Sequence, residues 1–231
     1  MQLAELARLN SARLQRRAAV VLTDISAGGS EVLVEGEGVP PALAGIVTGA
    51  LRSGKAGLTE IEGRTLFINV HLPPPRLLVI GAVHISQALA RMAPIIGYDL
   101  TIVDPRTAFA TEERFEGVKL VADWPEDVLK EQPLDAYTAL VAVTHDPKID
   151  DFPLSEALKA GCFYVGALGS RKTHAKRMER LKEMGCAETQ IATIAAPIGL
   201  DIGAATPAEI ALAILAQVVE AFRRRDLAAE A

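Results

Sequence analysis

The chain has 231 residues, 50% of them hydrophobic, which is enough for one full domain and a smaller one, each with a buried core. A net charge of -5 and a pI near 5.5 argue against general binding to nucleic acids or anionic membranes. Its two cysteines, Cys162 and Cys186, are too few for a disulfide framework and lack metal-ligand spacing. Residues 1–17 carry no signal-peptide pattern and no apolar run reaches the ~18 residues of a membrane span, so we expect a cytoplasmic protein.

The first third of the chain predicts a small α+β domain, residues 1–72. Turns at 27–30 and 62–63 join strands in pairs as hairpins. The triple proline at 73–75 forms a stiff connector, so we place the domain boundary there. The expected elements are a helix at 2–17, strands at 18–24 and 31–35, a helix at 40–51 and strands at 58–61 and 65–70.

The next stretch predicts a strand, a helix and a second strand. The apolar run at 76–80 is typical of a parallel strand covered on both faces. Apolar residues then recur at helical spacing over 83–96, and Gly97 suits a left-handed helix cap. The second strand, 100–103, leads into Asp104. This order predicts a Rossmann-like βαβ unit.

The βαβ unit resembles dinucleotide-binding units, in which an acid about 20 residues after the glycine turn holds ribose hydroxyls. Asp104 has that position and Arg106 could meet a 2′-phosphate, so an NAD- or NADP-dependent oxidoreductase stays open as an alternative, as does a nucleotide-binding regulatory protein. Only the first glycine, Gly81, is kept, and Val83 carries a branched side chain where phosphate usually approaches. The simpler interpretation is that Gly81 only makes the turn.

Strands and helices continue to alternate to the end of the chain. This alternation predicts an α/β fold, a Rossmann-like doubly wound parallel sheet over residues 76–226. Ligands of such sheets bind outside the carboxyl ends of the strands, where four loops meet. The further strands are expected at 118–121, 139–143 and 162–165, and the helices at 125–131, 151–159 and 206–222.

The loop at 144–151 gathers a histidine, three acids and a lysine after a buried strand. These groups suit proton transfer, metal binding or recognition of sugar hydroxyls. The local alternative is that Asp146 and the following proline make a turn, while Asp150 or Asp151 caps the next helix. Because one histidine is a weak basis for a metal site, we predict no metal and no catalytic residue.

The loop at 166–174 carries the strongest physical signal for a ligand. Its glycines free the backbone, and Ser170 suits an N-cap. Cations in the first turns of a helix oppose its dipole, but a bound phosphate or carboxylate would reverse that penalty. The alternative is a solvated helix balanced by Glu179 and Glu183. The crowded cations are Arg171, Lys172, Lys176 and Arg177.

The fourth loop, 196–203, places Asp201 among apolar residues, and Thr206, Pro207 and Glu209 then give a capping-box helix start. Together the loops predict one ligand site. The candidate cofactor-binding residues are Gly81, Ala82, Val83, His84, Asp104, Arg106, Thr144, His145, Asp146, Lys148, Gly166, Ala167, Leu168, Gly169, Ser170, Arg171, Lys172, His174 and Asp201.

Five segments of the second domain resemble the XdhC/CoxI family, the maturation factors of xanthine dehydrogenase and related molybdenum hydroxylases. The resemblance implies a Rossmann-like domain that binds molybdenum cofactor (molybdopterin). It also implies a cytoplasmic, homodimeric chaperone that assists sulfuration with a cysteine desulfurase and delivers the cofactor to the hydroxylase apoenzyme. The segments are LLVIGAVHISQAL (77–89), VDPR (103–106), THDPKIDD (144–151), FYVGALGSRKTHAKR (163–177) and PIGLDIGAATPAEIA (197–211).

The amino-terminal third departs from the family pattern. Longer members carry a glycine-serine-proline-arginine motif after their first strand and later a glycine-glycine-cysteine motif. Residues 19–38 contain neither arginine nor cysteine, so the roles of those motifs are not carried over. Cys162 is no substitute, because a cysteine that begins a buried strand is typically an inert thiol.

Overall fold

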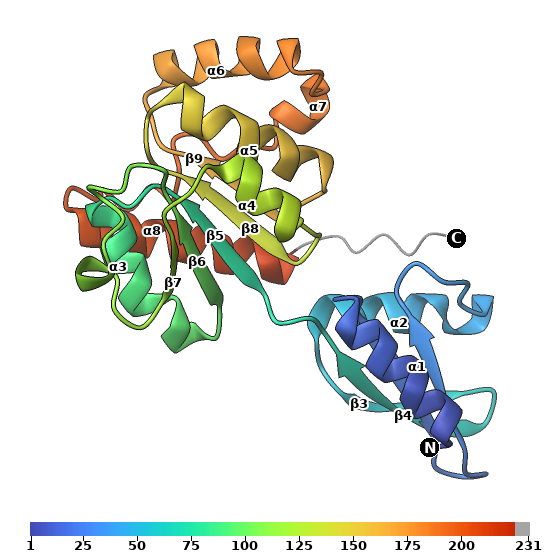
Figure 1. Cartoon of the computed structure of the whole chain (residues 1–231). Helices are drawn as coiled ribbons and strands as arrows, with labels where there is room; N and C mark the ends of the chain where they lie inside the picture. The colour runs from blue at the N-terminus through green and yellow to red at the C-terminus, as the bar shows by residue number, and fades with distance from the viewer. Residues whose placement is uncertain (225–231) are drawn as a thin grey trace. The chain divides into compact units, whose positions relative to one another are not determined.

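The computed structural model describes residues 1–224. The chain divides between Pro73 and Pro74 into two compact units, which Figure 1 shows with their helices and strands. The predicted end of the second domain at residue 226 lies outside the described residues.

The first unit is a four-stranded antiparallel sheet with two helices, as the α+β prediction expects. Its strand order is β2-β1-β4-β3, so the central pair joins two hairpins. Leu9 and Ala12 of α1 pack with Val21, Val32 and Val34 of the sheet. The elements are α1 (Leu3–Leu14), β1 (Ala19–Asp24), β2 (Ser30–Val34), α2 (Pro41–Ser53), β3 (Gly57–Ile61) and β4 (Arg64–His71).

The second unit is built on a five-stranded sheet in which every neighbouring pair is parallel. Its strand order is β7-β6-β5-β8-β9, so the chain runs outward from β5 and then returns to the other side of it. This confirms the predicted α/β class and puts the topological switch point between β5 and β8. The strands are β5 (Arg76–Ile80), β6 (Asp99–Val103), β7 (Lys119–Val121), β8 (Thr138–Ala142) and β9 (Tyr164–Ala167).

Helices cover both faces of this sheet, because alternate residues of β5 enter two separate cores. Leu77 and Val79 pack with α3 and α8, while Leu78 and Ile80 pack with α4, α5, α6 and α7 on the opposite face (Figure 1). The helices are α3 (His84–Met92), α4 (Pro125–Glu131), α5 (Pro147–Lys159), α6 (Arg171–Glu183), α7 (Glu188–Ile191) and α8 (Pro207–Arg224), with 3-10 turns at Pro94–Ile96 and Glu112–Arg114.

The start of α5 differs from the prediction. The helix begins at Pro147, four residues before the expected 151, and Asp146 caps it by accepting a hydrogen bond from the backbone N–H of Lys148 at 3.0 Å. Neither Asp150 nor Asp151 is the cap, because both lie inside the helix and are buried. Most of the expected 144–151 loop is therefore helical.

Two other boundaries also move. β9 begins at Tyr164 and continues through Ala167, because its residues pair in parallel with β8. Gly166 and Ala167, expected in a loop, are therefore buried strand residues. The helix expected over 83–96 ends at Met92 and continues as a 3-10 turn from Pro94, which has no backbone N–H to donate to the helical ladder.

Candidate functional site

The turn after β5 is satisfied by the protein itself. Gly81 has φ +119°, and a Cβ on it would lie 2.8 Å from Cγ2 of Thr144, so the close approach of the chain after β8 requires glycine. Asp104 at the end of β6 is fully buried and accepts a hydrogen bond from the backbone N–H of Ala82 at 2.7 Å. The turn thus donates its amide to a carboxylate of the same domain.

Arg106 engages both carboxylate oxygens of Asp104. Its Nε donates at 2.9 Å and its Nη2 at 2.8 Å, and its backbone N–H adds a third bond at 2.9 Å. Burial opposes ionisation, but these bonds and the one from Ala82 hold the pKa of Asp104 below its ordinary value. The acid expected to hold a ribose therefore presents no exposed oxygen, while Val83 and His84 lie beside it at the start of α3, His84 exposed.

The turn after β8 is organised by a second buried acid, Asp150. The hydroxyl of Thr144 donates to its Oδ1 at 2.7 Å, and the backbone N–H of His145 donates to its Oδ2 at 3.1 Å. These bonds hold His145 in the left-handed region, at φ +65°. Burial raises the pKa of Asp150 to about 6, although the Thr144 hydroxyl and the charge of Arg177 act in the opposite direction.

The turn after β9 begins α6 as the sequence predicts. The hydroxyl of Ser170 accepts a hydrogen bond from the backbone N–H of Thr173 at 3.2 Å, which confirms the expected N-cap. Gly169 has φ +142°, and a Cβ there would lie 3.3 Å from the Thr173 side chain and 3.9 Å from Nη2 of Arg177. The glycine leaves the space through which that Nη2 reaches the carbonyl oxygen of Leu168, at 3.0 Å.

Arg177 is the unusual member of this turn. Its residue surface is only 2% exposed, yet its Nε and Nη1 have no hydrogen-bond partner among residues 1–224. Burial lowers the pKa of Arg177, and the charges of Asp150 and Asp151 oppose that shift. A buried guanidinium with two vacant donor atoms is costly unless something accepts from them.

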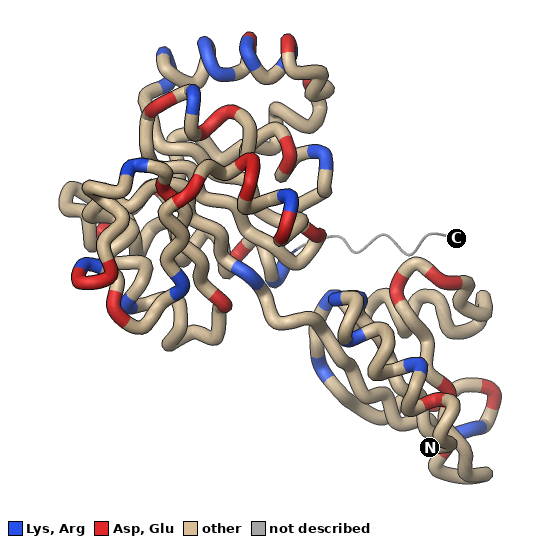
Figure 2. Tube along the Cα trace, in the orientation of Figure 1, with Lys and Arg blue, Asp and Glu red and all other residues tan. Residues whose placement is uncertain are grey.

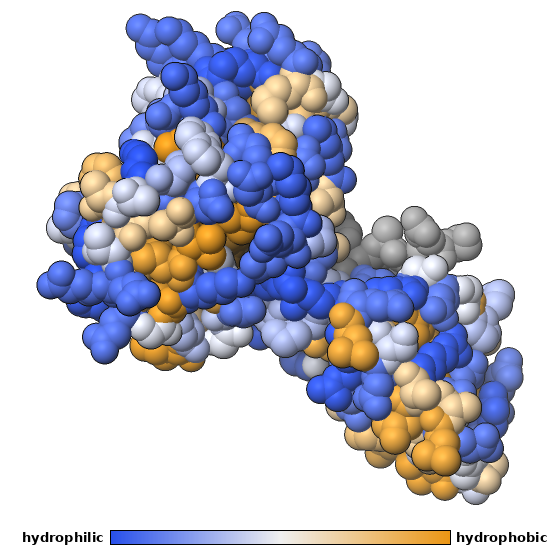
Figure 3. Space-filling view, in the orientation of Figure 1, coloured by the Kyte–Doolittle hydropathy of each residue, from blue (hydrophilic) through white to orange (hydrophobic). Residues whose placement is uncertain are grey.

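Arg177 lies on a groove of about 230 Å³ between α6 and the start of α5. Arg180, on the same helix face, pairs with Asp151 of α5 through Nε and Nη2. Figure 2 shows lysine and arginine recurring along α6, and the surface over this helix is hydrophilic in Figure 3. The groove, called here the α5–α6 groove, is lined by His145, Pro147, Lys172, Thr173, Lys176, Arg177 and Arg180.

The α5–α6 groove brings together only part of the predicted set. Lys172 and His145 line it, as do Lys176 and Arg177, whose charge the sequence had also indicated. Sequence reasoning missed Pro147, Thr173 and Arg180. Helical spacing could have found the last two, because positions 172, 173, 176, 177 and 180 share one helix face.

Several predicted residues lie elsewhere. Arg171 and Asp201 are exposed and are not among the residues that line the groove within the described chain. His174 faces inward beside Arg177, and burial followed by the charge of Arg177 lowers its pKa. Its Nδ1 is buried and has no partner among the residues described here.

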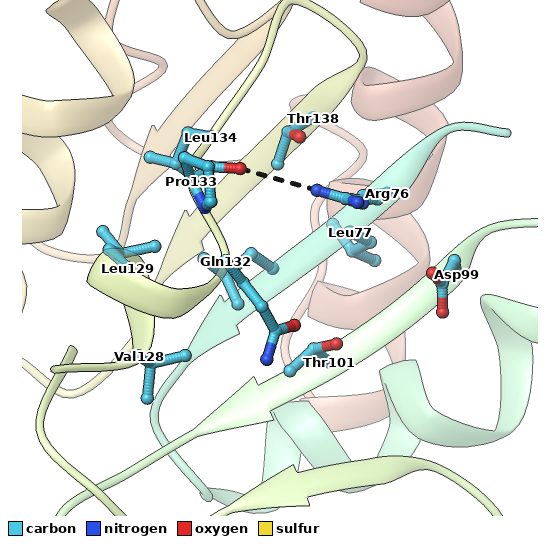
Figure 4. A pocket seen from close by; sticks show the side chains of 11 residues that line it. Arg76, Leu77, Asp99, Thr101, Val128, Leu129, Gln132, Pro133, Leu134 and Thr138 are labelled. Carbon is cyan, nitrogen blue, oxygen red and sulfur yellow. Dashed lines mark hydrogen bonds between the residues drawn. The ribbon is translucent and has the colours of Figure 1, made fainter. Parts of the chain in front are cut away.

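Another pocket lies at the opposite, amino-terminal ends of β5, β6 and β8. It is small, about 30 Å³, and Figure 4 shows Nη1 of Arg76 directed at the carbonyl oxygen of Pro133, 3.5 Å away. Asp99 and Thr138 also line it. This end of a parallel sheet is not where ligands of such folds usually bind.

Two further searches cover residues 1–224. No cluster of three or more histidine, cysteine and acidic side chains suited to a metal occurs there. Within the same residues, no helix has the length and apolar character needed to cross a membrane.

A doubly wound parallel sheet with a cationic groove at its carboxyl edge defines a Rossmann-type domain suited to an anionic ligand. Residues 77–218 match the family model described as the XdhC Rossmann domain. The chain therefore belongs to the XdhC family, which confirms the resemblance predicted from its motifs.

Three curated relatives are similar over roughly two thirds of the chain. Uncharacterized protein YqeB of Escherichia coli K12 is 30% identical over 68% of this chain and 29% of its own length. A probable xanthine dehydrogenase component of Bacillus subtilis is 30% identical over 69% and 46%, and the molybdenum cofactor insertion chaperone PaoD of E. coli K12 is 32% identical over 63% and 40%. The match thus spans less than half the length of each of these relatives.

A solved structure shares the fold. The crystal structure of a xanthine dehydrogenase from Bacillus halodurans superposes with a TM-score of 0.69 at 21% identity, over 96% of this chain and 67% of the other. At that identity the likeness concerns the fold alone.

Proposed function

We propose that this protein is a maturation factor that binds molybdenum cofactor at the carboxyl edge of its Rossmann sheet. It protects the cofactor and delivers it to a xanthine dehydrogenase-like molybdenum hydroxylase. The observation that carries the proposal is the buried Arg177, whose Nε and Nη1 have no partner among the described residues and which lines the α5–α6 groove. Molybdopterin carries a phosphate, which accepts hydrogen bonds from such donors. The name of the relative PaoD, a molybdenum cofactor insertion chaperone, supports the same role.

The residues of the groove fit binding better than turnover. Lys172, Lys176 and Arg177 would hold the phosphate of the cofactor by charge and hydrogen bonds, while Thr173 and His145 offer further polar contacts. A chaperone needs no nucleophile. Burial raises the pKa of the Cys162 thiol to about 12, so that cysteine stays protonated at neutral pH. We therefore assign the protein no catalytic residue.

The full role includes partners that the family resemblance implies. We propose that the protein works in the cytoplasm as a homodimer, meets a cysteine desulfurase during sulfuration of the cofactor and then meets the hydroxylase apoenzyme. Light scattering of the purified protein tests the dimer. Pull-down with purified desulfurase and with apo-hydroxylase tests the two contacts, and retention of neither partner would limit the role to storage of the cofactor.

The binding claim is tested by titration with molybdenum cofactor released from a molybdoenzyme under anaerobic conditions and, separately, with NAD and NADP. Trp124, the sole tryptophan, is half-exposed just before α4 and reports by fluorescence. We expect saturable binding and a raised melting temperature with the cofactor alone, because Asp104 is occupied by Arg106 and Ala82. Binding of NAD or NADP without binding of the cofactor would favour the oxidoreductase alternative.

Delivery needs its own measurement. Protein loaded with cofactor is mixed with apo-hydroxylase, and the hydroxylase activity that develops is followed over time. We expect activation to exceed that obtained with the same amount of free cofactor, because the bound form is shielded from water. If the loaded protein activated the apoenzyme no better than free cofactor, the chaperone role would be wrong even if binding were tight.

A further inference from the structure

We propose that the α5–α6 groove is a site for a phosphomonoester, that is, for a terminal phosphate group with two negative charges. A phosphate bridged between two organic groups, with one negative charge, would bind there more weakly. The inference deepens the proposed cofactor role and rests on it for the identity of the natural ligand. It concerns which end of that ligand the groove accepts.

The charge balance of the groove supports a dianion. Four cations line it, Lys172, Lys176, Arg177 and Arg180. Two buried carboxylates, Asp150 and Asp151, act on Arg177, which leaves two positive charges uncompensated with histidine counted neutral. Asp146 and Lys148, on either side of Pro147, balance each other. A terminal phosphate ester carries nearly two negative charges above pH 7 and so neutralises the groove.

The available donors suit the same ligand. Arg180 is committed to Asp151, but Nε and Nη1 of Arg177 have no partner in the part of the chain that is described. Lys172 and Lys176 likewise form no ion pair with a described residue. A terminal phosphate offers three oxygens to these donors, whereas a diester offers two and carries a second organic group that the groove must house.

A bridging pyrophosphate would need the turn after β5, where dinucleotide-binding domains place it. In this chain the N–H of Ala82 in that turn is donated to Asp104, and Val83 adds a branched side chain. The two turns at the switch point therefore differ. The turn after β5 is closed by its own carboxylate, while the α5–α6 groove after β8 and β9 keeps free donors.

The test uses a matched pair of small ligands, phenyl phosphate and methyl phenyl phosphate, titrated into the full chain at pH 8 and followed by calorimetry. At this pH the monoester is a dianion and the diester a monoanion. We expect phenyl phosphate to bind at least ~10-fold more tightly, since a charge-assisted hydrogen bond contributes roughly 1.5–3 kcal/mol. Equal affinity for the two ligands, or no binding of phenyl phosphate, would overturn the inference.

Variants locate the site. Lys172→Ala and Lys176→Ala alter exposed side chains, so they should leave the fold intact and each weaken phenyl phosphate binding by ~10-fold. The matched control is Lys182→Ala, on the same helix but paired with Glu188 away from the groove. It should change affinity less than ~2-fold, because an exposed ion pair contributes little. If Lys182→Ala weakened binding as much as Lys172→Ala, the groove would not be the site.

The two proposals fail separately. If phenyl phosphate binds as expected but molybdenum cofactor does not bind, the phosphomonoester site stands and the cofactor role is wrong. If the cofactor binds the wild type and both lysine variants equally while phenyl phosphate does not bind, the cofactor role stands and the inference is refuted.

Discussion

Asp150→Asn tests the electrostatics beneath the α5–α6 groove. The carboxylate is 1% exposed, accepts from the Thr144 hydroxyl at 2.7 Å and from the His145 N–H at 3.1 Å, and lies near the charge of Arg177. An amide can keep both contacts. Its oxygen accepts from the His145 N–H, and its NH₂ donates to the Thr144 hydroxyl, which is free to accept because hydroxyls both donate and accept.

The expected change is in the pH dependence of stability. Burial raises the pKa of Asp150 from 3.8 to about 6 in the folded protein, so the folded chain holds this proton more tightly than the unfolded chain does. The resulting stabilisation is complete below pH ~4 and is lost as the pH rises through about 6. A pKa difference of roughly two corresponds to about 3 kcal/mol.

Urea denaturation of wild type and variant between pH 4 and 8 gives the two free energies of unfolding. The wild type should lose about 2–3 kcal/mol relative to Asp150→Asn across this range. A constant offset from the changed contacts with Arg177 does not matter, because only the change with pH is compared. If the two stability curves stayed parallel from pH 4 to 8, Asp150 would not be the buried acid described here.

Three further changes test other parts of the second unit. Gly81→Ala should destabilise by ~3 kcal/mol, because its Cβ would lie 2.8 Å from Thr144 Cγ2 at positive φ, whereas Gly97→Ala, at φ +83° in open space, should cost about 1 kcal/mol; similar losses in urea melts would contradict this. Asp151→Asn, which frees Arg180, should tighten phenyl phosphate binding roughly 3–10-fold at low salt by calorimetry, and weaker binding would argue against an anion site. Thr206→Ala should cost about 1 kcal/mol because its hydroxyl accepts the Glu209 N–H at 3.3 Å, and Thr206→Ser should restore most of that in the same melts.

The fold was largely predictable because hydrophobic periodicity carries most of its information. The apolar run of β5 and the capping box at Thr206 and Glu209 are local signals, and both appear where expected. The start of α5 was missed although Asp146 and Pro147 give the same cap-and-proline signal as Thr206 and Pro207. Pro153 within α5 interrupts the helical pattern, so the segment before it resembled a loop.

The site was less predictable because its main features are long-range. That Asp104 is consumed by Ala82 depends on two strands lying side by side, whereas in the linear sequence Asp104 simply has the position of a ribose ligand. Burial of Arg177 depends on α6 packing beside α5, so composition could show the excess of cations but not which one lacks a partner. Arg180 was missed for the same reason, since its partner Asp151 lies 29 residues earlier.

The two turns beside the switch point use the same chemistry with opposite results. After β5, a buried acid, Asp104, meets Arg106 through three hydrogen bonds and takes the nearby Ala82 amide, so acid, arginine and turn satisfy one another. After β9, the buried Arg177 meets acids only through their charge, since Asp150 already accepts from Thr144 and His145 and Asp151 from Arg180. The residual binding capacity of this sheet edge therefore lies at the α5–α6 groove and not at the glycine turn. A search for the ligand of a diverged Rossmann domain should accordingly follow the unsatisfied buried donor rather than the position of the first glycine.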